Sequence, residues 1–223
     1  ALRGKPSVLK GEGSSPPLQC RYKFSHDRIQ QAAYTLISAG EKGALHRKIG
    51  QLLLDKIPME ERDGKLFDIV GNLNKGIECV CDQTERDALA HLNLQTGKKV
   101  KSTAAFESAH HYFKIAISLL GEESWDTQYD LTLALHVEAA ATAYLSAEFE
   151  EMEEWVRVVL QRAKTVLDKT KVYEVRILAY IAQNRLLEAV QTALPVLKEL
   201  GISLPEKPRK ADVLFGLLKT RVS

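Results

Sequence analysis

The sequence lacks long apolar runs and any marked excess of one charge. No stretch approaches the roughly 18 consecutive apolar residues of a membrane-spanning helix, and the first residues resemble neither a signal peptide nor an amphipathic presequence. Thirty-one Lys and Arg residues against 29 Asp and Glu residues leave a formal charge of +2, which is too small to attract nucleic acid or anionic lipid. We therefore expect no nucleic acid and no membrane among the partners, and recognition by shape.

Cysteine is also scarce. Cys20, Cys79 and Cys81 cannot all pair within the chain, and a medium-sized domain rich in Lys and Glu does not need a disulfide framework. We expect reduced thiols and a cytoplasmic location. The Cys79-x-Cys81 spacing is too sparse for zinc, so we expect no metal site.

The composition is that of an ordinary globular protein. Of its 223 residues, 45% are apolar and 27% charged, which is enough to bury a core in one or two domains. The chain begins with Ala1 and has no methionine before Met59, which favours a segment of a longer polypeptide.

The N-terminal part predicts a loop, a strand and a helix in succession. Residues 1–17 are rich in Gly, Pro and Ser, which excludes a helix there. Leu18–Phe24 alternates apolar and polar side chains with the period of a half-buried β-strand. At Asp27 the period becomes helical, with Ser25 placed to cap the helix and Asp27 near the positive end of its dipole.

Beyond Asp27 the apolar residues recur every three or four positions, which predicts a series of amphipathic helices. The predicted apolar faces of the first five helices are Ile29, Ala32, Ala33 and Leu36; Leu45, Ile49, Leu52 and Leu53; Leu66, Ile69, Val70, Leu73 and Ile77; Leu89, Leu92, Thr96 and Val100; and Phe106, Ala109, Phe113, Ala116, Ile117 and Leu120. Pro195 lies inside a later helix and should bend it.

The last two helix pairs are separated by breaks so short that each pair must form an antiparallel hairpin. An internal repeat relates them, and a weaker third copy places Ala109 opposite Ala189. The pairs are Tyr129–Tyr144 with Phe149–Ala163, and Val172–Ala182 with Leu186–Leu200; Ala143-Tyr144-Leu145 matches Ala179-Tyr180-Ile181 36 residues later, which aligns Met152 with Glu188.

A recurrence of about 34 to 40 residues built from two helices is typical of tetratricopeptide arrays. The sequence therefore predicts an all-α fold of antiparallel helical hairpins stacked as a tetratricopeptide-like α-solenoid, with one short N-terminal β-strand. We expect residues 1–40 to hold the loop, strand and first helix. The repeat array should occupy residues 41–204, and residues 205–223 a linker and a short helix around Asp212–Lys219.

Few residues suggest chemistry. His26 between Ser25 and Asp27 resembles the phosphoacceptor box of a dimerising kinase helix, but that box has arginine three residues after the histidine, whereas Arg28 comes two after. Thr96-Gly97-Lys98-Lys99 lacks the earlier glycine of a phosphate-binding loop.

We interpret the remaining candidates as packing or surface residues. Lys98, Lys99 and Lys101 fit a solvated helix face. His110 and His111 lie about 100° apart on a helix and cannot share a metal, so one should pack and the other face water. His46, His91 and His136 stand alone, and we expect Trp125 and Trp155 to fill the core rather than anchor a partner. We expect no catalytic residue in this chain.

Three blocks resemble the region that follows the nucleotide-binding module in large bacterial signalling kinases: Tyr22–Tyr34, Leu45–Leu54 and Asp68–Asn74. Such proteins join a serine/threonine kinase, a STAND-class AAA-like ATPase, a helical repeat region, a GAF sensor and often a histidine kinase. The resemblance runs from about Leu18 to Lys219. It implies that residues 1–40 are the remnant of a winged-helix-like subdomain.

The resemblance also implies a role for His26 and Asp27. In STAND ATPases a histidine-aspartate pair after the winged-helix strand touches the phosphates of bound ADP, and an imidazole can donate to a phosphate oxygen. A structural strand-to-helix junction is the other interpretation of this pair. ATP or ADP with Mg would belong to the parent ATPase module, and the chain itself would bind no cofactor.

The resulting functional hypothesis is a non-catalytic regulatory and scaffold segment that couples an ATPase and kinase to sensor domains by protein–protein contact. Its partners would be the adjacent ATPase and sensor domains of the same polypeptide, and other proteins. The alternative is the inducer- or protein-binding array of a LuxR-like ATPase transcription activator.

Overall fold

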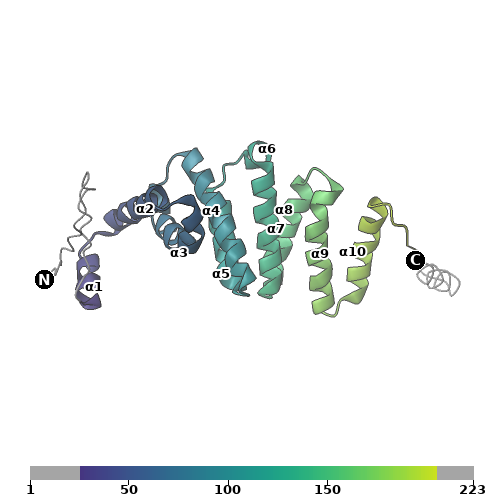
Figure 1. The fold of residues 1–223 in the computed structure, drawn as a ribbon. Coiled ribbons are helices and arrows are strands. Elements are labelled where there is room, and N and C mark those ends of the chain that lie inside the picture. Colours follow the sequence, from purple (N-terminus) through teal and green to yellow (C-terminus); the bar gives the residue numbers. More distant parts are fainter. Residues whose placement is uncertain (1–25, 205–223) are drawn as a thin grey trace.

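The computed structural model describes residues 26–204, and all regular structure in that range is helical (Figure 1). The predicted all-α class is therefore confirmed for these residues. The predicted strand Leu18–Phe24 and the C-terminal helix Asp212–Lys219 lie outside them. The helices are α1 (Asp27–Thr35), α2 (Ala39–Lys56), α3 (Met59–Lys75), the 3₁₀ turn η1 (Ile77–Cys79), α4 (Gln83–Ser102), α5 (Phe106–Leu119), α6 (Ser124–Thr127), α7 (Tyr129–Leu145), α8 (Phe149–Arg162), α9 (Val166–Ala182) and α10 (Leu186–Glu199).

The long helices pair into hairpins that follow one another in a row (Figure 1). The pairs are α2 with α3, α4 with α5, α7 with α8, and α9 with α10. The second helix of one pair packs on the first helix of the next, as α5 does on α7 and α8 on α9. First helices also touch, α4 with α7 and α7 with α9, so each described hairpin beyond the first has neighbours from the preceding one.

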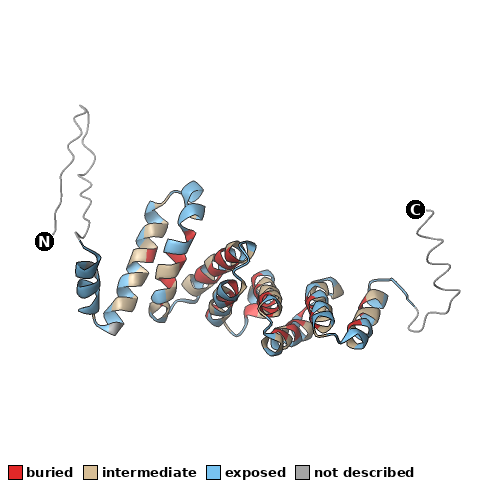
Figure 2. Cartoon of the chain, turned by 90° about the horizontal axis from the view of Figure 1, so that it is seen from below, coloured by how far each residue is buried: buried red, intermediate tan, exposed pale blue. Residues whose placement is uncertain are grey.

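The core consists of two clusters that meet at α7. Phe113, Leu119 and Leu135 are fully buried in the first cluster, which α3, α4, α5 and α7 form. Val156 and Val172 are fully buried in the second, between α7, α8 and α9. From α2 to α10, buried residues follow the helix sides that face neighbouring helices (Figure 2), because no single hairpin can cover its own apolar face.

The predicted apolar face of α2 is less buried than its pattern suggests. Leu45 is 38% and Leu52 44% exposed. Beyond α3 and η1, α2 has few described neighbours because it lies near one end of the row.

Three hairpins turn through the same backbone conformation. Ala104, Ala147 and Asn184 each adopt a left-handed conformation, with φ of 61°, 60° and 58°. The N–H of Glu148 donates to the carbonyl of Ala143 at 2.9 Å, the six-to-one bond of a Schellman turn that ends a helix. The first of the four hairpins turns differently, through Pro58.

These equivalent turns correct the register of the predicted repeat. Helices α7 and α9 begin 37 residues apart, as do α8 and α10. The 36-residue match of Ala143-Tyr144-Leu145 is therefore wrong by one position, and Met152 corresponds to Ala189 rather than Glu188. The alignment of Ala109 with Ala189 agrees with the helix starts, since Ala109, Met152 and Ala189 occupy the fourth position of their helices and are all buried.

Helices α4 and α5 lie close together at Gly97. A β-carbon there would lie 2.4 Å from Cε1 and 2.8 Å from Cζ of Phe113. Because the Phe113 ring is fully buried in the first core cluster, it has little room to move away.

The shared turns predict that glycine at Ala104 and at Ala147 stabilises the chain. A left-handed conformation is strained for alanine but not for glycine, so each substitution should raise the free energy of unfolding by about 0.5–1 kcal/mol. Ala88→Gly, at an exposed position inside α4, is the matched control and should lower it by about 1 kcal/mol. Urea unfolding followed by circular dichroism measures all three, and equal losses at the three sites would contradict the turn assignment.

The helix contact at Gly97 predicts a loss of stability for Gly97→Ala. Overpacking against Phe113 should cost about 1–3 kcal/mol. Gly71→Ala in α3 adds the same methyl group where nothing lies within 4 Å, and should gain about 0.5–1 kcal/mol. Thermal unfolding of the two variants should therefore shift in opposite directions from the native chain.

Candidate functional site

His26 and Asp27 lie at the start of α1, at one end of the row. His26 itself, rather than the predicted Ser25, directly precedes α1, and its side chain makes no capping hydrogen bond. Both side chains are exposed. The nucleotide contact that the resemblance implies for this pair stays a prediction.

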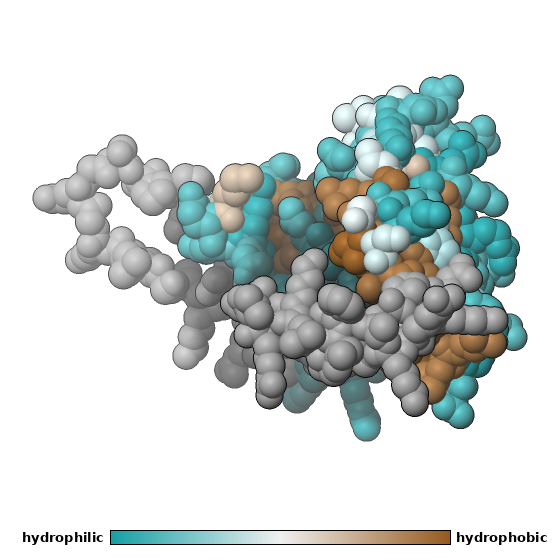
Figure 3. All heavy atoms as spheres, turned by 90° about the vertical axis from the view of Figure 1, so that its right-hand side faces the viewer, coloured by the Kyte–Doolittle hydropathy of each residue, from teal (hydrophilic) through white to brown (hydrophobic). Residues whose placement is uncertain are grey.

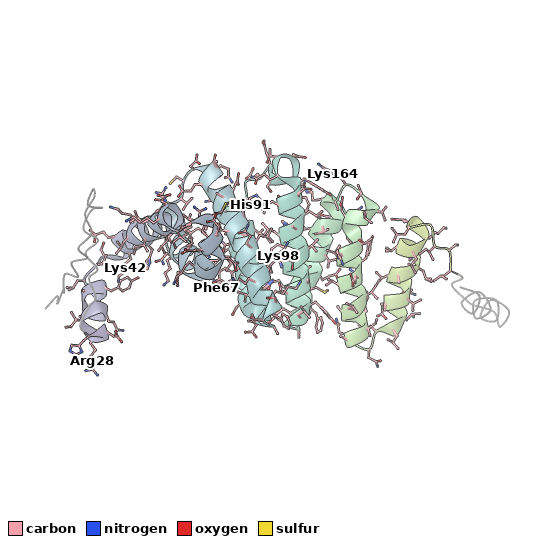
Figure 4. All side chains as sticks on the ribbon, in the orientation of Figure 1. Arg28, Lys42, Phe67, His91, Lys98 and Lys164 are labelled. Carbon is pink, nitrogen blue, oxygen red and sulfur yellow. The ribbon has the colours of Figure 1, made fainter. Side chains whose placement is uncertain are left out.

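Hydrogen bonds among three side chains connect α1 to α2 and α3. The Tyr34 hydroxyl donates to Nε2 of His46 at 2.8 Å, and Nδ1 of His46 lies 2.8 Å from Oδ1 of Asn72. The Asn72 amide donates to the Asp68 carbonyl, which leaves Oδ1 to accept from His46. The ammonium of Lys42 lies 4.9 Å from the centre of the Tyr34 ring (Figure 4).

The prediction that one histidine of α5 packs while the other faces water is confirmed. His110 is buried and its Nδ1 lies 3.0 Å from the Thr142 hydroxyl of α7, whereas His111 is exposed. Within residues 26–204, no group of three or more His, Cys, Asp or Glu side chains is placed to hold a metal ion.

The lysines of α4 differ from the prediction of a purely solvated face. Lys98 is exposed (Figure 4), but Lys99 pairs with Asp63 of α3 at 2.7 Å and Lys101 with Glu138 of α7 at 2.8 Å. Two of the three therefore connect neighbouring helices, which sequence periodicity alone could not reveal.

His136 and the two tryptophans pack together. The His136 ring lies 5.0 Å from the ring of Trp125 and 5.5 Å from that of Trp155, measured between centroids. Both tryptophans pack on the second core cluster, which supports the prediction that they fill the core. Burial lowers the pKa of His136, although the contact between its Nδ1 and the Thr132 carbonyl opposes this effect.

Sequence reasoning missed a groove along the first helices of three successive hairpins, α4, α7 and α9. It encloses about 640 Å³. Its apolar lining comes from α7 and α9: Leu133, Ala134, Val137, Ala141, Tyr144, Leu145, Leu167, Val175 and Leu178. Among these, Leu167 is 72% and Leu178 41% exposed, so the groove presents apolar surface to solvent.

Charged and polar groups border this apolar surface. The Lys101–Glu138 ion pair lies at the α4 side, and Lys171 with Glu174 at the α9 side. Asp130 and Asp168 add two further carboxylates. The four carboxylates against two ammonium groups give the border a negative balance.

Tyr129 of α7 links α7 to the start of α9 beside the groove. Its hydroxyl donates to Oδ2 of Asp168 at 2.8 Å and accepts the N–H of Lys164 at 2.8 Å. The Lys164 ammonium also lies 4.3 Å from the centre of the Tyr129 ring (Figure 4). Hydrogen bonds from Thr165 and Tyr129 lower the pKa of Asp168, so its carboxylate stays charged.

The sequence carries one signal of this groove. Helix α7 has only Asp130, His136 and Glu138 as ionisable groups on an otherwise apolar or small surface, apart from its tyrosines. A helix that is apolar on most sides is covered on most sides. Two sides of α7 contact the two core clusters, and the groove exposes part of a third.

Comparison with known proteins gives one informative similarity. The hybrid signal transduction histidine kinase G of Dictyostelium discoideum is 31% identical over 208 aligned residues. The match covers 82% of this chain but 6% of the kinase, so the chain corresponds to a small part of a much longer protein. This similarity over most of the chain fits a signalling-kinase context.

No protein-family model matches the chain. No solved structure matches it either. Among the described helices, none combines the length and the apolar character needed to cross a membrane.

The lowered pKa of His136 predicts a pH-dependent stability. An unfolded histidine takes up a proton near pH 6.5, whereas the folded ring stays neutral to lower pH. Stability should therefore be complete above about pH 6.5 and fall as the pH decreases from there toward the folded pKa. His136→Phe, which keeps the aromatic contacts, should weaken this dependence between pH 7 and 5, whereas His111→Gln should retain it. Urea midpoints across this range measure the effect, and identical slopes in both variants would argue against it.

Proposed function

We propose that this chain is a non-catalytic, tetratricopeptide-like regulatory segment of a multidomain signalling protein. The serial hairpins, the repeated turn and the 37-residue spacing of the last two pairs support a repeat array. The similarity to part of a hybrid histidine kinase supports the signalling setting, and it favours this function over the array of a transcription activator.

The observation that carries the proposal is the groove on α4, α7 and α9. It is open, largely apolar and bordered by charges, which are the features of a surface that binds another protein segment. Because the groove is built from consecutive first helices, a bound segment would contact several hairpins at once and fix their relative positions.

The array would be coupled to a neighbouring domain if that domain bound the groove more tightly in one of its states than in another. In this proposal, an adjacent domain, the ATPase or a sensor, docks in the groove in one state and leaves it in another, so the array shifts the balance between the two states. His26 and Asp27, exposed at the α1 end of the row, would contact the nucleotide of the ATPase. The Tyr34–His46–Asn72 hydrogen bonds would hold that contact in place relative to the array.

The test replaces two exposed apolar side chains of the groove. Leu167→Glu with Leu178→Glu should weaken binding of the chain to the remaining domains of its parent protein at least tenfold. Each leucine is worth about 1.5–3 kcal/mol when buried. The matched control is Leu36→Glu with Met59→Glu. These two apolar side chains lie outside the groove and are 87% and 78% exposed.

Isothermal titration calorimetry measures both double variants, with circular dichroism to show that each is folded. The control should bind within twofold of the native chain. Equal affinity of the groove variant and the control would overturn the groove as the docking surface. Hydrolysis of ATP by the purified chain would overturn the non-catalytic assignment.

A further inference from the structure

The lining of the groove forms a long stripe on each of two helices. On α7 it runs from Asp130 to Leu145, with the three- and four-residue spacing of one helix side. On α9 it runs from Leu167 to Leu178. At about 1.5 Å per residue the two stripes are about 22 Å and 16 Å long, which matches a bound helix of about 11–15 residues, or about three to four turns.

Exposed apolar surface alone does not identify a partner. The α10 end of the row presents such surface too (Figure 3), and Leu187 there is 67% exposed. The groove differs because charged side chains border it and because its walls are helices. These two features restrict the chemistry of a segment that can occupy it.

The walls of the groove offer few backbone partners. Most of the lining lies inside α7 and α9, where N–H and C=O groups bond within the helix. An extended segment laid on this surface would bury backbone groups that find no partner, which is unfavourable. A helix bonds its own backbone, so the groove fits an amphipathic helix.

The negative balance of the border is concentrated at one end of the groove. The two ion pairs of the border, with N–O distances of 2.8 and 3.4 Å, each carry no net charge. The remaining carboxylates are Asp130, the second residue of α7, and Asp168, the third residue of α9. Burial raises the pKa of Tyr129, and the charges of Asp168 and Asp130 add to this effect, so both carboxylates lie near its hydroxyl. The groove therefore has an acidic end where α7 and α9 begin.

Asp130 is more available to a partner than Asp168. Thr165 and Tyr129 donate hydrogen bonds to Asp168, and Lys164 adds a favourable charge. The side chain of Asp130 is exposed, and none of the ion pairs within residues 26–204 includes it. A cation at this end of the groove could therefore pair with Asp130.

We propose that the docking domain places a basic amphipathic helix in the groove, with its apolar side on α7 and α9 and a Lys or Arg at the end that lies over Asp130. This inference rests on the proposed docking role of the groove and names the kind of segment that docks. The apolar side of the helix would cover Leu167 and Leu178, which are exposed. A helix with Asp or Glu at the same end would be repelled by Asp130, so the charge selects the partner.

Selection from a displayed library of random 15-residue peptides on the full chain tests the proposal. Peptides that bind the native chain but not the Leu167→Glu, Leu178→Glu variant should carry apolar residues at helical spacing and an excess of Lys and Arg over Asp and Glu.

Charge reversal at Asp130 gives the sharper comparison. Asp130→Lys should lower the affinity of the selected peptides at least fivefold, because attraction becomes repulsion. Asp126→Lys makes the same change at an exposed position of α6 that does not line the groove, and should leave affinity within twofold. Fluorescence polarisation measures both variants, and circular dichroism shows that each is folded.

Three outcomes would overturn the inference: no enrichment that depends on the groove, selected peptides without a basic excess or with the alternating spacing of a strand, and equal affinities for the two lysine variants. The proposed function fails separately. If the remaining domains of the parent protein bind through the groove while the selected peptides lack a basic excess, docking stands and only this inference falls. If those domains do not bind but the peptides are basic and helical, the docking role falls and the selectivity of the groove stands.

Discussion

The structure depends on the burial of one hairpin by the next. No helix pair in the described range covers its own apolar face, and α7 illustrates the consequence most clearly. Leu135 and Ala139 of α7 belong to one core cluster, while Ala140 and Ala143 belong to the next. Removing one hairpin would expose apolar surface on both neighbours, so stability is shared along the row rather than concentrated in one centre.

Polar side chains join neighbouring hairpins within this apolar framework. His110 contacts Thr142, Tyr129 joins Asp168, and Arg176 pairs with Glu153, each across two hairpins. Such contacts are directional, whereas apolar packing is not. The Tyr129–Asp168 hydrogen bond lies beside the groove and links α7 to the start of α9.

This architecture suits a part of a signalling protein that transmits contacts. The match to the hybrid histidine kinase covers 6% of that protein, so most of the kinase lies outside the matched region. In the proposed function, the row separates two places where neighbours would attach, α1 with His26 and the groove with α10 beyond it. In that proposal, each hairpin packs on the next, so a domain that binds or leaves one of these places would alter the packing of the neighbouring hairpins.

The sequence by itself determined most of the helices, because helical periodicity is a local property, although α9 begins at Val166 and not at the predicted Val172. Helix α7 was predicted to begin at Tyr129 and α10 at Leu186, as the structure has them, and the buried and exposed members of the His110–His111 pair followed from their 100° separation. Tertiary structure alone decided the rest. The repeat register moved by one residue because turn conformation, rather than side-chain similarity, defines equivalence. The pairing of Lys99 and Lys101, the exposure of Leu45 and Leu52, and the groove all depend on which helices become neighbours, and residues distant in the chain decide that.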